Sequence, residues 1–387
     1  MKIVYFVESL VTTGGTERIV SEKANYLAER FGYDVSIIVC TQGQDQPNAF
    51  PLSNHINQIC LGIPLYSQYR YKYPKRLWVK NSIQRELRVL LTQKIQLLNP
   101  DILIGIGHFK ADLICSIECN AKKIIECHEA RLFTLSGMSQ HHNVITKIFQ
   151  YSYRKKYFRV IEKKADVVVT LTQGDKQLWN KAKHVEVIPN FSLMPICRTS
   201  SCETKRIIAV GRLSWEKGYD RLLAIWAKIE KKYPDWHLDV FGEGELEKEL
   251  STVIAMNGLK NIAMHRFTND ISHEYSNSSI CVLASYYEGF ALTLLEALRH
   301  GVPCIAFDCP FGPASIIEDN KCGFLVKNND INMYIEKLSL LMKDTPLRIK
   351  FSKAAIKRSE DFSIDFVMSQ WGALLEKIIK NGSTNRH

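Results

Sequence analysis

Short apolar runs alternate with helical patterns along the first half of the chain. Five of these runs span four or five residues, which is the length of a buried strand. They occupy residues 3–7, 35–39, 102–106, 123–126 and 167–171. Parallel strands need crossover connections, which are usually helices, and helical patterns between the runs meet this need. The alternation therefore predicts an α/β fold with a doubly wound parallel sheet.

The same alternation resumes in the second half. Strand-like runs lie at 206–210, 238–241, 280–284 and 304–307, and helical patterns lie at 219–230, 292–298 and 363–379. Between the halves, residues 191–205 contain a proline and several serines and threonines, as linkers often do. A chain of 387 residues suits two domains, since one domain typically has about 50–250 residues. We predict an N-terminal domain at 1–192 and a C-terminal domain at 193–363.

The stretch from 281 to 308 has the clearest local organisation. A buried strand is followed by a loop with Gly289, then by a helix that Gly301 and Pro303 end, then by a second strand. The start of such a helix presents free backbone N–H groups and the positive end of the helix dipole. This combination favours a bound phosphate.

Two carboxylates flank this helix start. Glu288 lies in the loop, and Glu296 lies eight positions further on, about two turns into the helix. An acid before a helix can serve only the helix dipole, which is worth about 0.3–1 kcal/mol. Glu296 has alanine and leucine neighbours, so its carboxylate needs a partner. The residues alone leave a structural and a functional interpretation open.

Residues 288–303, EGFALTLLEALRHGVP, resemble the E-x7-E signature of retaining glycosyltransferases of the GT-B fold. These are the family-4 type enzymes that build lipopolysaccharides, capsules and lipid-linked glycans. The resemblance implies two Rossmann-like doubly wound domains that face each other across a cleft. It also implies that a C-terminal helix at about 364–380 completes the N-terminal domain.

The resemblance assigns roles to this stretch. Glu288 would hold ring hydroxyls of the donor sugar near the reacting carbon, and Glu296 would accept hydrogen bonds from ribose hydroxyls. The donor diphosphate would lie at the helix start, which comprises Gly289, Phe290, Ala291 and Leu292.

A second glycine-bearing loop, GRLSWEKG at 211–218, follows the strand at 206–210. Arginine can bind a diphosphate in bidentate fashion and lysine supplies a compact charge, each charge-assisted bond being worth roughly 1.5–3 kcal/mol. A salt bridge to Glu216 is the alternative. The spacing resembles the GR(L/F)xxxKG donor-phosphate motif of the same family, which implies that Arg212 and Lys217 bind the donor. The family's G-x-G loop, here 242–244, would line the nucleotide side.

The loop after the first strand carries two adjacent glycines. Any Rossmann-like layer can have such a turn, so the residues alone indicate little. The segment resembles the GGxER loop of the same family. The resemblance implies that Gly15 faces the donor phosphate and that the acceptor side of this loop comprises Gly14, Glu17 and Arg18.

His128 follows the strand at 123–126, at the carboxyl end where open α/β sheets bind ligands. Composition alone favours a surface histidine. The family has a histidine at this point near the hydroxymethyl side of the donor sugar, so the resemblance implies a catalytic-site role. Glu129 receives no role. The chain departs from the family at Phe191, where glycine is usual, and at Ser315, where glutamate is usual.

Almost all of the net positive charge lies in the first half. Residues 1–195 hold 26 lysines and arginines against 16 acids, whereas the remainder holds 25 against 24. Two stretches, 68–80 and 145–164, interleave aromatic residues with cations. Solvated helix faces, an anionic membrane surface or a nucleic acid would each suit them. Because no nucleic-acid motif accompanies them, we predict membrane contact and no nucleic acid.

Several features bear on the cellular setting. No apolar run reaches the roughly 18 residues that cross a bilayer, and the first residues indicate a strand and not a signal peptide. The 11 cysteines are scattered without a CxxC pair, which favours free thiols in a reducing compartment. We therefore predict a cytoplasmic protein, peripheral on the inner face of the cell membrane. A metal is not expected, because Arg212, Lys217 and the backbone of the helix start would neutralise the diphosphate and because there is no DxD pair. No cofactor is expected besides the nucleotide-sugar substrate.

The predicted activity is retaining transfer of a hexose or N-acetylhexosamine. The donor would be a nucleoside-diphosphate sugar, a UDP-sugar in preference to GDP-mannose, and the acceptor a glycan, lipid-linked. A nucleotide-sugar epimerase on the same fold is the alternative from another reaction class. A non-catalytic glycan- or membrane-binding protein is a third. Two carboxylates also suggest a glycosidase, but a mid-helix glutamate beside a phosphate-binding loop argues against hydrolysis.

Overall fold

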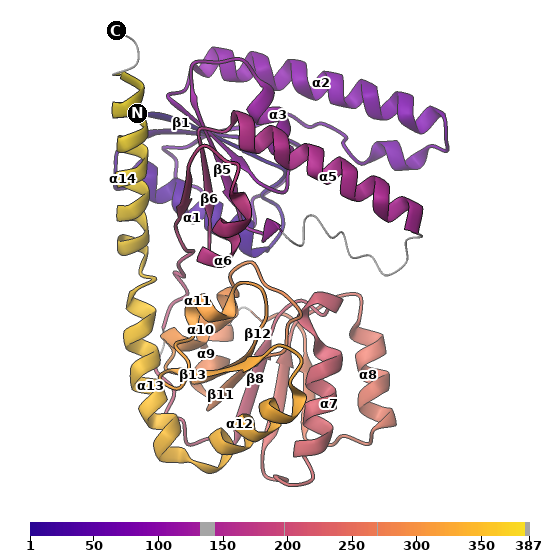
Figure 1. Ribbon diagram of the computed structural model, residues 1–387, viewed down its shortest axis with the longest axis vertical. Coiled ribbons are helices and arrows are strands. Elements are labelled where there is room, and N and C mark those ends of the chain that lie inside the picture. Colours follow the sequence, from indigo (N-terminus) through magenta and orange to yellow (C-terminus); the bar gives the residue numbers. More distant parts are fainter. Residues whose placement is uncertain (132–143, 197, 269, 384–387) are drawn as a thin grey trace. The chain divides into compact units, whose positions relative to one another are not determined.

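The structure, a computed structural model, describes residues 1–131, 144–196, 198–268 and 270–383. The chain divides into two compact units, each with its own sheet (Figure 1). The first unit comprises Met1–Leu171, Asp175–Ile188 and the C-terminal segment from Met368. The second comprises Pro189–Val367 together with Thr172–Gly174. Among the helices of the described residues, none combines the length and the apolarity needed to cross a membrane.

The described residues of the first unit form a seven-stranded sheet in which every neighbouring pair is parallel. The strand order is β3-β2-β1-β4-β5-β6-β7. The strands are β1 (Lys2–Val7), β2 (Asp34–Val39), β3 (Asn57–Cys60), β4 (Ile102–Ile106), β5 (Lys122–Cys127), β6 (Val167–Thr170) and β7 (Val185–Val187). The central strands β1, β4 and β6 are almost wholly buried, because helices cover both faces of the sheet.

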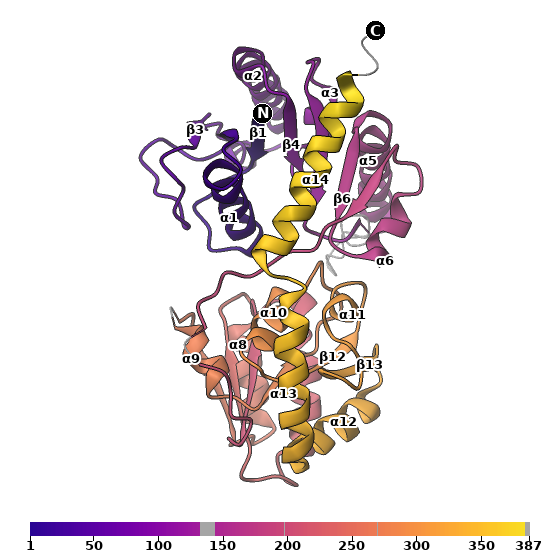
Figure 2. The same cartoon turned by 90° about the vertical axis from the view of Figure 1, so that its left-hand side faces the viewer.

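The helices of this unit lie on both faces of the sheet. They are α1 (Gly15–Glu29), η1 (Ser67–Arg70), α2 (Lys75–Leu98), α3 (Ala111–Ser116), α5 (Val144–Lys164), α6 (Gln173–Lys176), η2 (Gln177–Trp179) and α14 (Ile364–Ser383). Residues of α2, α3 and α5 form one core with alternate strand positions such as Val4 and Phe6. On the other side, α14 packs beside α1, where the Lys23 ammonium lies 4.1 Å from the ring centroid of Trp371 (Figure 2).

One face of α5 differs from its prediction. It belongs to the stretch 145–164, for which membrane contact was predicted, but its apolar residues Phe158 and Ile161 are buried in the core of the first unit. The Tyr157 hydroxyl donates to the carbonyl of Gly107 and accepts from the backbone N–H of Ala111, both at 2.9 Å. For Phe158 and Ile161 the prediction is wrong, because these side chains cover the sheet, whereas Tyr153 on the same predicted side is 62% exposed. The side chains of Ile148 and Phe149 lie outside the described residues.

The second unit repeats the architecture. Its described residues form a six-stranded parallel sheet in the order β10-β9-β8-β11-β12-β13. The strands are β8 (Arg206–Val210), β9 (His237–Phe241), β10 (Ile262–His265), β11 (Ile280–Leu283), β12 (Cys304–Asp308) and β13 (Gly323–Lys327). The helices are η3 (Trp215–Lys217), α7 (Tyr219–Ile229), α8 (Glu247–Met256), α9 (Ile271–Ser276), α10 (Leu292–Arg299), α11 (Pro313–Ile316), α12 (Ile331–Lys343) and α13 (Thr345–Glu360). Two parallel sheets confirm the predicted fold class.

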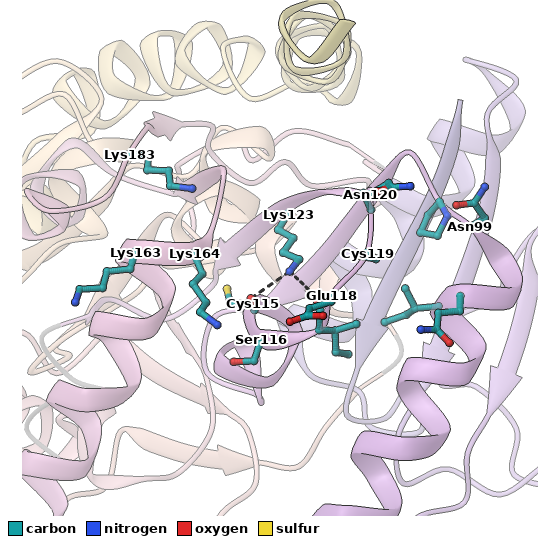
Figure 3. A pocket seen from close by; sticks show the side chains of 15 residues that line it. Asn99, Cys115, Ser116, Glu118, Cys119, Asn120, Lys123, Lys163, Lys164 and Lys183 are labelled. Atoms are coloured by element: carbon teal, nitrogen blue, oxygen red, sulfur yellow. Dashed lines mark hydrogen bonds between the residues drawn. The ribbon is translucent and has the colours of Figure 1, made fainter. Parts of the chain in front are cut away.

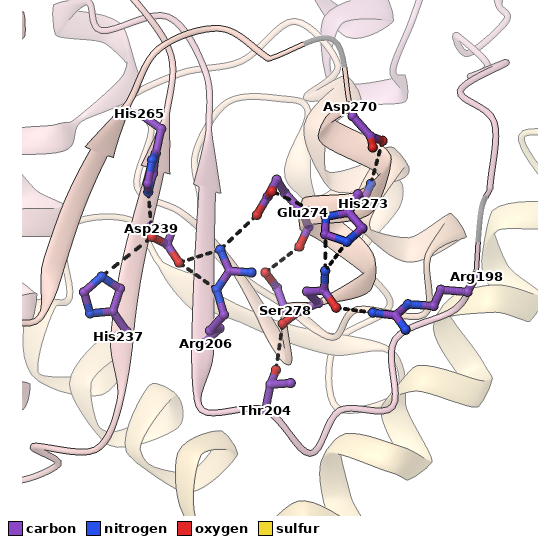
Figure 4. Close-up of polar contacts among 11 residues, drawn as sticks. Arg198, Thr204, Arg206, His237, Asp239, His265, Asp270, His273, Glu274 and Ser278 are labelled. Atoms are coloured by element: carbon purple, nitrogen blue, oxygen red, sulfur yellow. Dashed lines mark hydrogen bonds and ion pairs between the residues drawn. The ribbon is translucent and has the colours of Figure 1, made fainter.

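A polar network ties together the edge of the second sheet (Figure 4). The buried carboxylate of Asp239 on β9 accepts from Arg206 on β8 and is paired with His265 on β10 at 2.7 Å. Arg206 also binds Glu274 on α9 at 2.9 Å. Burial acts to lower the pKa of Arg206, but Glu274 and Asp239 more than offset it and raise that pKa. The network joins three strands and a helix, away from the loops that follow β8 and β11.

The described cysteines are unpaired. All ten that the structure describes are free, and eight of these are buried. This confirms the prediction of buried free thiols. In the described part of the chain, no three histidine, cysteine, aspartate or glutamate side chains converge as a metal-binding group.

The chain order reverses once in each sheet. In the first unit the reversal lies between β1 and β4, and in the second it lies between β8 and β11. Open parallel sheets bind ligands outside the carboxyl ends of the strands at such a switch point. In the second unit, the loops that leave β8 and β11 are the two that the sequence analysis singled out.

Candidate active site

Lys217 and Glu288 meet at the switch point of the second unit. The Glu288 carboxylate is buried, and its Oε1 accepts a hydrogen bond of 2.7 Å from the Lys217 ammonium. The same oxygen accepts from the hydroxyl of Ser285 at 2.6 Å. A charge-assisted pair of this kind is short and strong. The loops after β8 and β11 are thus joined by two of the predicted site residues, and Glu216, the alternative partner of Lys217, pairs with Ser214.

The backbone around Glu288 is fixed by the segment after β12. The N–H of Glu288 donates to the carbonyl of Pro310, and the N–H of Phe311 donates to the carbonyl of Glu288, both at 3.0 Å. A Cβ at Gly312 would lie 2.9 Å from the Cβ of Glu288 and 3.0 Å from the carbonyl carbon of Phe290. Only glycine allows this approach, so the carboxylate is held by a backbone clamp as well as by its side-chain partners.

The helix start predicted to bind phosphate is present. Residue Ala291 caps α10 in the left-handed region, with φ of 55°, and the helix begins at Leu292. Phe290 is buried against Phe362, with ring centroids 5.7 Å apart. The first N–H groups of a helix have no intrahelical partner, so this end carries partial positive charge. Its cap, Ala291, follows Glu288 by three positions in the sequence.

Glu296 has the partner that its apolar surroundings require. It lies in the second turn of α10, is buried, and accepts from the Tyr275 hydroxyl at 3.4 Å. Burial and the nearby Glu296 raise the pKa of Tyr275, which keeps this hydroxyl protonated as a donor. His300 stacks on Tyr275 with centroids 5.4 Å apart. Sequence reasoning asked for a partner but could not name Tyr275.

Arg212 is exposed, and its side chain has no hydrogen-bond or ion-pair partner among the described residues. Residues 242–244 pack against the loop that carries Arg212. A Cβ at Gly242 would lie 1.9 Å from the Gly211 carbonyl oxygen, and one at Gly244 would lie 2.3 Å from that of Leu213. The two glycines therefore let the loops pack backbone against backbone and leave the guanidinium available for a ligand.

Arg221 is a supporting residue that sequence reasoning missed. From α7 it donates to the carbonyl of Ala284 at the end of β11, and to the side-chain oxygens of Asn328 and Asn329 at 2.9 and 2.7 Å. Its guanidinium lies 4.0 Å from the ring centroid of Tyr286. Burial lowers the pKa of Arg221. The signal was an arginine within an apolar helical pattern.

Tyr286 links the two loops through stacking. Its ring stacks on Trp215 with centroids 4.8 Å apart and planes 11° apart. Its hydroxyl donates to Asp220 at 2.5 Å, and its N–H donates to the carbonyl of Glu216 at 2.8 Å. Burial and the hydrogen bond to Asp220 raise the pKa of Tyr286 to about 12. The Lys217 and Glu288 loops are therefore joined by stacking and by hydrogen bonds as well as by the ion pair.

Gly218→Ala should disrupt this junction. Gly218 has φ of +64°, and a Cβ there would lie 2.0 Å from the Ala284 carbonyl oxygen. Gly258 has a similar φ of +60° but nothing within 4 Å, so Gly258→Ala is a matched control. Gly258→Ala should lower the free energy of unfolding by only about 1–2 kcal/mol, the cost of a left-handed backbone for a residue with a Cβ. Urea unfolding should show a larger loss of stability for Gly218→Ala, and equal losses would contradict the close approach.

In the first unit, the glycine loop has mainly local contacts. Gly14 caps α1 and Gly15 is its first residue. Glu17 accepts from the Thr12 hydroxyl at 2.8 Å, and Arg18 forms an ion pair with Glu22 at 2.8 Å. Glu17 and Arg18 thus shape the loop, and the structure provides no further sign of the acceptor role predicted for them.

His128 is buried, so the interpretation as a surface histidine is wrong. Its Nε2 lies 3.2 Å from the Glu126 carboxylate, which is itself paired with the buried Lys23 of α1. Burial lowers the pKa of His128 and outweighs the opposing effect of Glu126. The neutral ring therefore donates from Nε2, and its Nδ1 is an acceptor with no partner among the described residues.

Glu126 supplies the negative charge of this cluster, opposite the Lys23 ammonium. Burial acts to raise the pKa of its carboxyl, but the Lys23 ammonium and the His128 ring more than offset this and leave the pKa below its ordinary value. The carboxylate fixes the tautomer and orientation of His128. Glu126 and Lys23 were not identified from the sequence, although a glutamate inside a strand pattern is a visible signal.

Known proteins are similar to this chain in sequence and in fold. A family model described as glycosyl transferases group 1 matches residues 199–358. An uncharacterized glycosyltransferase of Haemophilus influenzae is 32% identical over 380 residues, covering 97% of this chain and 99% of that protein. The amylovoran biosynthesis glycosyltransferase AmsD of Erwinia amylovora is 27% identical over 388 residues, with coverage of 97% and 99%.

A solved glycosyltransferase structure has a similar fold. A point mutant of TarM of S. aureus, in complex with fondaparinux, alpha-GlcNAc-glycerol and UDP, matches with a TM-score of 0.75 at 16% identity, covering 97% of this chain and 99% of that one. Fold and relatives together define a glycosyltransferase of the GT-B fold. The chain belongs to the glycosyl transferases group 1 family. This favours sugar transfer over the epimerase alternative.

Proposed function

We propose that the protein transfers a hexose or N-acetylhexosamine from a UDP-sugar to a glycan acceptor, lipid-linked, with retention of anomeric configuration. The observation that carries the proposal is the pairing of Lys217 with Glu288 beside the start of α10. The UDP in the TarM complex supports the nucleotide, and its alpha-GlcNAc-glycerol supports a glycan acceptor. The name of AmsD supports a place in polysaccharide assembly.

The leaving diphosphate gathers negative charge during transfer, and fixed positive groups stabilise it. In this proposal Arg212, whose side chain lacks a described partner, and Lys217 bind the diphosphate together with the first N–H groups of α10. Lys217 would then be shared between the diphosphate and Glu288. These groups supply the charge that a divalent cation provides elsewhere, so we expect a chelator to leave the rate unchanged.

The carboxylates bind hydroxyl groups in this proposal. Glu288 has one oxygen occupied by Lys217 and Ser285, and the other would accept from the ring hydroxyls of the donor sugar. Its charge also favours positive charge developing at the anomeric carbon. Glu296, oriented by Tyr275, would accept from the ribose hydroxyls. No covalent intermediate on a carboxylate is required for this arrangement.

His128 is proposed to bind the donor sugar through Nδ1. This buried acceptor lacks a described partner, and an unmet buried acceptor costs about 1–3 kcal/mol. A hydroxymethyl O–H of the sugar would satisfy it, while Glu126 holds the ring from the other side. In the same unit as His128, Gly15 would face the donor phosphate and Gly14 the acceptor. Glu17 and Arg18 would shape the acceptor side of that loop.

Product analysis after incubation with a panel of UDP-, GDP- and ADP-sugars tests the proposal. With a glycan acceptor, the product should keep the anomeric configuration of the donor, as read from the anomeric proton coupling by NMR, with and without chelator. Without acceptor, the donor should not isomerise. An isomerised donor would support the epimerase instead, and an inverted product would contradict retention.

The membrane part of the proposal rests on the surface at the start of α2. Tyr69, Tyr73 and Trp78 are exposed there, at 60%, 75% and 73%. Lys72 and Lys75 are exposed in the same stretch. Aromatic residues among cations suit the headgroup layer of an anionic membrane. We therefore propose a peripheral location on the inner face of the cell membrane.

Vesicle co-sedimentation should show this contact. Each cation near an anionic surface contributes about 1 kcal/mol, so Lys72→Gln/Lys75→Gln should weaken binding to phosphatidylglycerol vesicles by roughly tenfold or more. Added salt should weaken it as well. Trp78→Ala should reduce binding, whereas Leu97→Ala, a residue 78% exposed at the other end of the same helix, should not. Equal effects of both substitutions would contradict this surface.

A further inference from the structure

A polar cavity lies at the amino ends of the strands of the first unit (Figure 3). Its volume is about 770 Å³, within the range of small-molecule sites. It is lined by the end of α2, the loop between α3 and β5, the start of β5, the end of α5 and Lys183. Lys123 is the second residue of β5, whereas His128 follows its last. At about 3.3 Å per residue the two lie roughly 17 Å apart. The cavity is therefore separate from the candidate active site.

The charge in this cavity is strongly unbalanced. Its lining includes Lys123, Lys163, Lys164 and Lys183, against the single acid Glu118. Among the described residues, the ammonium groups of Lys163, Lys164 and Lys183 have no hydrogen-bond or ion-pair partner. Ammonium groups that share one cavity repel each other, and an anion between them would remove that repulsion.

Lys123 forms the floor of the cavity. Its ammonium donates to the carbonyl of Cys115 at 3.1 Å and to the carbonyl of Ile117. An ammonium has three N–H donors, so one is left for a ligand. Burial raises the pKa of the Cys115 thiol to about 12, so no thiolate competes for the lysines. The floor is thus a cation fixed in place by the backbone.

A simpler interpretation covers only part of this arrangement. Lys163 and Lys164 lie in the last turn of α5, where cations complement the helix dipole. That does not explain why Lys123 from β5 and Lys183 from the loop before β7 line the same cavity. Three separate chain segments bring cations to one polar space of ligand size.

We propose that this cavity binds a phosphoryl-bearing anion, supplied either by a soluble phosphorylated molecule or by a phospholipid headgroup. Lysine ammonium groups bind a phosphate as point charges. A site lined by lysines without arginine therefore does not demand one orientation of the phosphate. The proposal does not depend on the proposed function, since its residues belong to neither the Lys217–Glu288 pair nor the His128 cluster.

Lysine acetylation, measured peptide by peptide by mass spectrometry, tests the proposal on the full chain. Pyrophosphate at about ten times its Kd should slow acetylation of Lys164 and Lys183 about tenfold, with ionic strength held constant by chloride. Lys231 and Lys248, which are exposed in the second unit, serve as controls and should react at an unchanged rate. In Lys164→Gln/Lys183→Gln, pyrophosphate should no longer protect Lys163, whereas Lys231→Gln/Lys248→Gln should keep that protection.

The source of the anion is read from a second arm. Vesicles of phosphatidylglycerol in phosphatidylcholine are compared with vesicles of phosphatidylcholine alone. Protection by pyrophosphate but not by the anionic vesicles indicates a soluble ligand, and protection by the anionic vesicles indicates a headgroup; either result supports the site. No protection in either arm, or equal slowing at Lys231 and Lys248, would overturn it.

Discussion

Glu288→Gln lowers kcat for sugar transfer by about 10²–10³-fold, the size of effect seen when one preorganised electrostatic group is removed from a transition state. The amide still accepts the hydrogen bond that Ser285 donates at 2.6 Å, so the local fold is kept. It cannot carry the charge that pairs with Lys217 at 2.7 Å or that faces the reacting carbon. Steady-state kinetics with the preferred UDP-sugar measures the change.

The matched control is Glu216→Gln. Glu216 lies next to Lys217 in sequence, and its carboxylate pairs with Ser214 and not with Lys217. It should keep the wild-type rate. Because Lys217 is partly exposed, loss of its partner should leave the melting temperature of Glu288→Gln close to that of the wild type. A full rate in Glu288→Gln, or an equal loss in Glu216→Gln, would remove Glu288 from the chemistry.

Lys23→Met destabilises the first unit by about 3–5 kcal/mol, the usual cost of breaking a buried ion pair by removing one partner. The Glu126 carboxylate stays buried without a cation beside it, since the His128 ring next to it is neutral. Replacing both charges is often nearly neutral, so Lys23→Met/Glu126→Gln should recover most of the loss. Urea unfolding followed by far-ultraviolet circular dichroism measures the loss.

Lys156→Met controls for the change in net charge, since Lys156 is exposed on α5 of the same unit. It should cost little. If the double variant instead loses the sum of the two single effects, Lys23 and Glu126 do not act as a pair. If Lys23→Met costs no more than Lys156→Met, the buried pair does not stabilise the unit.

The interior strands were predictable because each is a short, nearly continuous apolar run. β1, β4 and β11 show this pattern, and each lies between other strands in its sheet. The edge strands β3, β10 and β13 were missed. The residues of β3 and β10 are mostly half-buried, so these strands lack the apolar run that marks a strand with two covered faces. In β13 the apolar run is short, from Phe324 to Val326, between a glycine and a lysine.

The site was predictable in its residue types but not in its contacts. The motifs identified Lys217 and Glu288 separately, while the bond between them joins residues 71 apart in sequence. Lys23 and Glu126 are 103 apart. Such pairs depend on strand order, which places β8 beside β11 and orders β1, β4 and β5 side by side. Single-sequence patterns carry local periodicity, and strand order emerges only from the whole fold.

The central claim is that the loops after β8 and β11 bind the donor diphosphate. A crystal structure of the protein with bound UDP tests it most directly. The account predicts the diphosphate within hydrogen-bond distance of the Arg212 and Lys217 side chains and the first N–H groups of α10. UDP bound elsewhere on the chain, or bound with Arg212 and Lys217 turned away from the phosphates, would contradict it.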